Sequence, residues 1–212
     1  MKFILLVEGQ TERDAAAAFL KRWLDPQLRQ PVGIQTVTFD GYADLVSKMA
    51  TKARMHLEGP TRTEIVGVIG LLDLYGPTFY PPEKSTADER FAWGRTHFEK
   101  QVDLDKFRLF FAVHEFEAWL LSQPDIFSRE IKNALSGKIG QPERVNFDQP
   151  PAKLLDRIYK QQTRRNYKKI TYGKQLFSTL DPAVATDKCP YLKALLDEML
   201  TMAKAAGLGG SD

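Results

Sequence analysis

The chain has 212 residues, a formal net charge of +3 at pH 7 and a single cysteine. This length suits one well-filled α/β domain with an appendage and is short for two independent cores. The near-neutral charge excludes a global attraction to nucleic acid, so any such site has to be a local basic patch. A lone cysteine, Cys189, excludes an intramolecular disulfide, and no apolar segment reaches the roughly 20 residues of a membrane span. We therefore expect a cytoplasmic protein without a membrane segment.

The first half of the chain alternates apolar runs with helical patterns. The runs predict strands, and the amphipathic spacing between them predicts helices. Thr11, with Asp14 three residues later, predicts a capping box at the first helix. The expected strands are 3–7, 34–39, 64–72 and 107–113, and the expected helices are 11–23, 42–57 and 88–102. Short links between such units predict a mostly parallel sheet with helices on both faces.

Carboxylates follow two of these buried strands. Glu8 comes directly after the first strand, Asp73 follows the third, and Glu12 lies one helical turn beyond Glu8. Because parallel α/β sheets gather their ligands at the carboxyl ends of the strands, we expect these acids to converge. The alternative is that they are surface, capping or turn acids without a common site.

The segment His114–Leu121, His-Glu-Phe-Glu-Ala-Trp-Leu-Leu, follows the fourth strand directly. If the strand continues, Glu115 and Glu117 point the same way. If a helix begins at His114, then His114 and Glu117 are neighbours and Glu115 turns away. We favour a helix that begins within this segment, because its apolar residues follow helical spacing.

Two of these motifs resemble a known superfamily. Val7–Glu12, Val-Glu-Gly-Gln-Thr-Glu, resembles the opening motif of Toprim domains, the metal-dependent, Rossmann-like fold of topoisomerases, bacterial primases and the overcoming-lysogenization-defect (OLD) nucleases. The segment His114–Leu121 is similar to the His-Glu-Phe-Glu-Ala-Leu-Leu-Phe motif of small bacterial Toprim-like proteins of unknown function. The sequence departs from the Toprim pattern at Tyr75, which stands where the second Asp of an Asp-x-Asp pair is expected.

The resemblance implies an activity and a setting. OLD-type nucleases hydrolyse phosphodiester bonds, and members of the similar family are often encoded beside an ABC- or OLD-type ATPase, which implies defence against phage or mobile DNA. In the related nucleases a lysine downstream of the acids stabilises the reacting phosphate. Lys168, Lys169 and Lys174 are the candidates here, and we place Lys169 first.

Several carboxylates without a cysteine or histidine cluster are hard oxygen ligands, which suit Mg²⁺ or Mn²⁺. We expect Glu8 and Glu12 to hold one ion, and Asp73 and Glu117, with Glu115 assisting, to hold a second. Glu8 and Asp73 would then be catalytic, together with Lys169. The sequence thus predicts a metal-dependent nuclease.

The last third of the chain is predicted to be helical, with helices at 152–162 and 191–202. We expect an α/β core at 1–125, a helical appendage packed on it at 126–206, and a disordered tail at 207–212. Basic and aromatic residues alternate between the two helices, which suits binding of a phosphate backbone with stacked bases, although such a run is often only a solvated face. The predicted nucleic-acid-binding residues are Arg164, Arg165, Tyr167, Lys168, Lys169 and Lys174.

Two other functions fit the sequence. One is a non-catalytic Toprim-like subunit that docks on an ATPase, which Tyr75 favours because it removes a metal ligand. The other is a ribonuclease or primase-type transferase that uses the same metal site. The choice between DNA and RNA, and the oligomeric state, stay open at this point.

Overall fold

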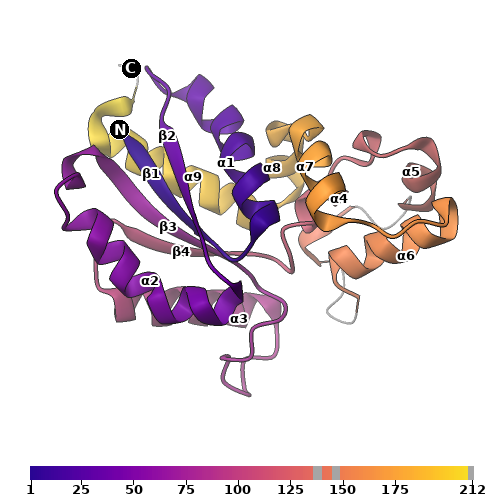
Figure 1. Ribbon diagram of the computed structural model, residues 1–212, viewed down its shortest axis with the longest axis horizontal. Helices are drawn as coiled ribbons and strands as arrows, with labels where there is room; N and C mark the ends of the chain where they lie inside the picture. The colour runs from indigo at the N-terminus through magenta and orange to yellow at the C-terminus, as the bar shows by residue number, and fades with distance from the viewer. Residues whose placement is uncertain (136–139, 145–148, 210–212) are drawn as a thin grey trace.

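The computed structural model describes residues 1–135, 140–144 and 149–209 (Figure 1). Four parallel strands form one sheet in the order β2-β1-β3-β4. Their bounds are β1 Lys2–Val7, β2 Gly33–Thr38, β3 Ile65–Asp73 and β4 Phe107–Ala112. The two central strands are the continuous apolar runs, because both of their faces are covered, whereas the edge strand β2 is only partly buried. The predicted α/β class and parallel sheet are confirmed.

Helices cover both faces of the sheet. On one face α1 (Gln10–Leu24) and α9 (Pro190–Ala203) pack together, and on the other α2 (Gly41–Leu57) lies beside α3 (Ala87–Val102), as Figure 1 shows. The last helix approaches the sheet closely at Gly67, where an added Cβ would lie 2.2 Å from Met202 Cε. The helix nearest the C-terminus is therefore part of the layered core.

The remaining helices lie between β4 and α9 in the chain. They extend away from the sheet and then return to it. They are α4 Ala118–Leu121, α5 Arg129–Leu135, α6 Pro151–Thr163, α7 Lys169–Thr179 and α8 Pro182–Lys188. Figure 1 shows α5 and α6 farthest from the sheet, whereas α7 runs beside α1 and packs on it. Short 3₁₀ turns lie at Asp25–Gln27, Arg62–Glu64, Pro124–Ile126 and Pro142–Arg144, and a π turn lies at Lys204–Leu208. In the described part of the chain, we find no helix both long enough and apolar enough to cross a membrane.

Two local predictions were wrong. The first helix begins at Gln10, with Gly9 as its N-cap, so Thr11 lies inside the helix and is not its N-cap as predicted. The reason is that Gly9 is extended (φ −152°, ψ −176°), which allows the helix to begin directly after it. The end of the chain is ordered as far as Gly209, since Leu208 is only 3% exposed and its carbonyl accepts a hydrogen bond from Arg29 N at 3.0 Å. Residues 210–212 of the predicted tail lie outside the described residues.

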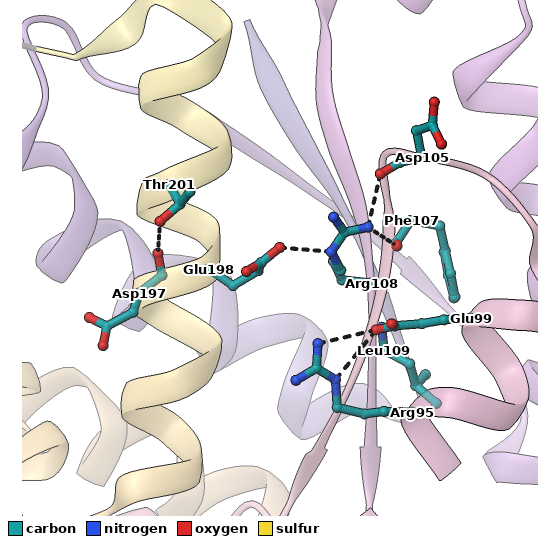
Figure 2. Close-up of polar contacts among 9 residues, drawn as sticks. All are labelled: Arg95, Glu99, Asp105, Phe107, Arg108, Leu109, Asp197, Glu198 and Thr201. Atoms are coloured by element: carbon teal, nitrogen blue, oxygen red, sulfur yellow. Dashed lines mark hydrogen bonds and ion pairs between the residues drawn. The ribbon is translucent and has the colours of Figure 1, made fainter. Parts of the chain in front are cut away.

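The outer edge of β4 is closed by side chains from α3 and α9 (Figure 2). Glu99 Oε1 accepts a hydrogen bond from Leu109 N at 2.9 Å and lies 3.4 Å from Arg95 Nε. On the other side Arg108 Nε donates to Glu198 Oε1 at 2.7 Å. A side-chain acceptor in this place keeps an edge-strand N–H from pairing with another chain.

We expect Glu99→Ala to lower the free energy of unfolding by about 1–2 kcal/mol, because the N–H of buried Leu109 loses its acceptor. Urea denaturation measures the change. Lys100→Ala, an exposed neighbour on the same helix, is the matched control and should stay within about 0.5 kcal/mol of wild type. Equal effects of the two substitutions would contradict a role for Glu99 at the edge.

Candidate metal and active site

The ends of three adjacent strands are joined by two carboxylates. Glu8, directly after β1, accepts a hydrogen bond from Asp73 N through Oε1 at 2.7 Å. Asp73, the last residue of β3, accepts one from Phe116 N through Oδ1 at 2.8 Å, and Phe116 lies in the turn after β4. The predicted meeting of Glu8 and Asp73 at one edge of the sheet is confirmed by this contact.

Lys169 places its ammonium among the acids. It is the first residue of α7, and its Nζ lies 3.0 Å from Glu117 Oε2, 3.5 Å from Asp73 Oδ2 and 3.7 Å from Glu12 Oε1. The acids come from α1, β3 and the turn before α4, so four separate segments meet here. We call Glu8, Glu12, Asp73 and Glu117 the carboxylate cluster.

The cluster is poorly solvated. Glu117 is fully buried, and apart from its ion pair with Lys169 neither of its oxygens accepts a hydrogen bond from any described residue. Burial, opposed by Lys169 and reinforced by Asp73, raises the pKa of Glu117 to about 8. Burial and then the charge of Asp73 also raise the pKa of Glu8 to about 8, and the same two causes raise the pKa of Glu12.

Lys169 is the cation that lies beside these acids. Burial alone would lower its pKa, but the charges of Asp73, Glu117 and Glu12 outweigh burial and raise the pKa of Lys169 above its usual value. The ammonium therefore stays charged at any physiological pH. It supplies one positive charge to four carboxylates, so the cluster is under-compensated if all four are ionised.

The two acids of the His114–Leu121 segment diverge. Helix α4 begins at Ala118, within this segment, and Glu117 is its N-cap residue. Glu115 instead accepts a hydrogen bond from Ala152 N through Oε2 at 2.8 Å, which joins the first turn of α6 to the site. Burial raises the pKa of Glu115, although the Ala152 bond opposes this. Of the two acids, only Glu117 enters the cluster.

The chemistry of the donor set fits a hard divalent cation. As the side chains stand, no group of three or more His, Cys, Asp or Glu residues among those described is arranged to hold an ion directly. The Lys169 ammonium instead lies within 4 Å of an oxygen of Glu12, Asp73 and Glu117. The carboxylate oxygens are nevertheless of the type that Mg²⁺ and Mn²⁺ prefer, and the fully buried oxygens of Glu117 have no other cation beside them in the part of the chain that is described.

The predicted nucleic-acid residues are scattered. Arg164, Arg165 and Lys168 are exposed on the link between α6 and α7, and Lys174 is exposed on α7. The prediction that Tyr167 stacks on bases is corrected, because this residue is only 8% exposed and packs against Tyr159 and Tyr172. Its ring belongs to the hydrophobic core of the appendage.

Sequence reasoning missed the basic face of α6. Lys153, Arg157 and Lys160 line a cavity of about 610 Å³ whose far wall includes Lys169. Their spacing of four and three residues was a usable signal, because such residues share one side of a helix. The basic run that follows α6 is denser in the sequence, and it therefore gave the stronger pattern.

Comparison with known proteins gives one family and a set of similar structures. The family model described as "Domain of unknown function (DUF4276)" matches residues 7–200. The C-terminal region of the Burkholderia pseudomallei OLD protein is similar to this chain at 20% identity and a TM-score of 0.48, covering 96% of this chain and 98% of that one. The C-terminal region of the Xanthomonas campestris pv. campestris OLD protein, at 19% identity and a TM-score of 0.46, covers 97% and 96%. No curated protein matches the chain. A likeness of this degree says nothing about activity.

Proposed function

This chain belongs to the DUF4276 family, whose function is unknown, and from its carboxylate cluster we propose that it is a metal-dependent phosphodiesterase that cleaves nucleic acid. One observation carries the proposal: Glu12, Asp73 and Glu117 converge from separate segments on a single cation, Lys169, and Glu8 accepts a hydrogen bond from Asp73 N beside them. Buried carboxylates that are not neutralised by structural partners are costly to the fold, which makes them candidates for a functional site.

Glu8, Glu12, Asp73 and Glu117 are the residues that would hold Mg²⁺ or Mn²⁺. A bound divalent ion stabilises negative charge on a phosphoryl group and lowers the pKa of a bound water. Glu115 has one oxygen committed to Ala152 N, so its role is to fix the position of α6 beside the site.

The remaining chemistry is supplied by this chain's own side chains. The Lys169 ammonium keeps its proton, and it can therefore donate a hydrogen bond to a phosphate oxygen brought to the cluster. Asp73 N engages only Oε1 of Glu8, which leaves Glu8 Oε2 as the oxygen that would face a bound cation.

The test is Mn²⁺-dependent cleavage of DNA and RNA by the purified chain. We expect Glu8→Gln to lower the rate by more than about a hundredfold, since the loss of even an outer-shell partner costs up to that factor. The amide keeps an oxygen for Asp73 N, so the fold should persist. Glu58→Gln, an exposed acid after α2, is the matched control and should cleave like wild type.

A rival function follows from the position of Lys169, which already supplies a cation to the cluster without any metal. In this view the chain is a non-catalytic subunit that docks on an ATPase. If the wild-type protein binds metal, millimolar Mn²⁺ should raise its melting temperature by mass action. The same Mn²⁺ concentration should raise the melting temperature of Glu8→Gln much less. Equal responses of the two proteins, together with absent cleavage, would favour the rival. The ATPase partner and a defence role rest on the sequence resemblance, a cytoplasmic location rests on the lone cysteine and the lack of a membrane segment in the sequence, and all three stay predictions.

A further inference from the structure

A basic face of α6 borders the carboxylate cluster. Lys153, Arg157 and Lys160 are all exposed and lie on one side of the helix. Together with Tyr167 and Lys169 they line the cavity of about 610 Å³. Because Lys169 also contacts Glu117, the cavity and the cluster share one wall.

The three cations differ in how they are engaged. Lys160 pairs with Asp156 at 2.7 Å, which also accepts a hydrogen bond from Tyr167 N at 3.1 Å. The ammonium of Lys153 lies 5.7 Å from the centre of the Tyr75 ring, two residues beyond Asp73. Within the described residues, Arg157 has neither an ion pair nor a hydrogen bond. A free guanidinium can bind a phosphate through two parallel hydrogen bonds.

The position of α6 relative to the acids is fixed. Glu115 accepts a hydrogen bond from Ala152 N, the residue directly before Lys153, and the Lys153 ammonium lies 5.7 Å from the centre of the Tyr75 ring, two residues beyond the end of β3. Lys153 and Arg157 are four residues apart, which places them about 6 Å apart along the helix axis. This distance is close to the rise of two stacked nucleotides, at about 3.4 Å each.

We propose that this face of α6 is a binding groove for one strand of nucleic acid, whose backbone phosphates contact Lys153 and Arg157. The groove leads a phosphodiester towards the carboxylate cluster, and in this respect the inference rests on the proposed function. It also gives Tyr75 a role, since the ring that replaces an expected acid lies 5.7 Å from the Lys153 ammonium, within range of a cation–π contact. The binding residues are thus on α6, and not on the link from Arg164 to Lys168.

The test measures binding without cleavage. A fluorescent oligothymidine is titrated with the full chain in EDTA at several salt concentrations, and anisotropy gives Kd. Arg157→Ala and Lys153→Ala should each weaken binding and reduce the slope of log Kd against log salt by about 0.7 for each lost phosphate contact. Arg157→Lys should keep the slope, because the charge remains. Lys100→Ala, an exposed cation near the end of α3, should bind like wild type.

The inference is overturned if Arg157→Ala leaves both Kd and the salt slope unchanged. It is also overturned if polyglutamate competes as well as the oligonucleotide, since any polyanion would then do. The two proposals fail separately. If Mn²⁺ supports no cleavage but Arg157→Ala weakens binding, the proposed binding groove is supported and the proposed phosphodiesterase activity is contradicted. If cleavage occurs and Arg157→Ala changes neither KM nor Kd, the groove falls alone.

Discussion

Lys169→Met is expected to lower the free energy of unfolding of the metal-free protein by about 3 kcal/mol. The substitution leaves Glu117, which is fully buried, without its only nearby cation among the described residues. Breaking a buried ion pair by removing one partner costs about 3–5 kcal/mol, and we take the lower end because 36% of the Lys169 side chain is exposed. Urea denaturation in EDTA at about pH 9, above the folded-state pKa of Glu117 of about 8, so that its carboxylate is ionised, measures the loss.

A double-mutant cycle separates charge from packing. Glu117→Gln removes the charge that Lys169 neutralises, so Lys169→Met with Glu117→Gln should be considerably more stable than Lys169→Met alone. If the two effects simply add, then Lys169 stabilises the site through its packing and not through its charge. Mn²⁺ should restore part of the stability of Lys169→Met, because an ion held by the same oxygens replaces the missing ammonium.

The second large effect is a loss of stability with rising pH in the metal-free protein. Glu8 and Glu117 have folded-state pKa values of about 8, because burial disfavours their ionised forms, against an ordinary glutamate pKa of 4.5. Between these values the folded state binds more protons than the unfolded state, so the free energy of unfolding falls as pH rises. The stabilisation is complete below about pH 4.5 and is lost once pH passes about 8. We expect a fall on the order of several kcal/mol between about pH 5 and about pH 9.

Substitutions show which residues cause the dependence of stability on pH. Glu117→Gln should make the slope shallower, with the contribution of Glu8 remaining, whereas Glu58→Gln should leave it unchanged. Glu143 contributes with the same sign, because burial raises its pKa to about 7, and this contribution persists in both variants. A slope in Glu117→Gln equal to that of wild type would show that Glu117 is already ionised in the folded protein. With Mn²⁺ the fall should be smaller, since metal ligands have to be deprotonated and metal binding strengthens with pH.

The sheet was predictable from sequence because its central strands are buried on both faces. From Phe3 in β1 and from Ile65 in β3, the chain contains only apolar residues and glycine until the strand ends, and the acids at those ends had to emerge at one edge. The sequence could not predict that Glu117 joins the carboxylate cluster while Glu115 binds the backbone of α6. This difference depends on the turn between β4 and α4, and on the distant Ala152 N–H that engages Glu115.

Other features could not be predicted from the sequence because they depend on packing between segments that are far apart in the chain. Lys169 was placed first among three lysines only by resemblance, since nothing local shows that α7 begins there or that it packs on α1. Tyr167 lies between basic residues in the sequence, and this pattern indicated a surface position. Its ring instead packs with Tyr159 of α6 and Tyr172 of α7. The segment that became α7 was not among the predicted helices.

The bond from Ala152 N to Glu115 also bears on how the family can vary. It joins the turn before α4 to the first turn of α6 at one carboxylate. The length and composition of the intervening chain can therefore change between relatives while the registration of α6 on the sheet is kept, because lengthening a closed loop adds little entropic cost. Insertions and deletions should accumulate in that interval, and Glu115 should persist where its neighbours drift.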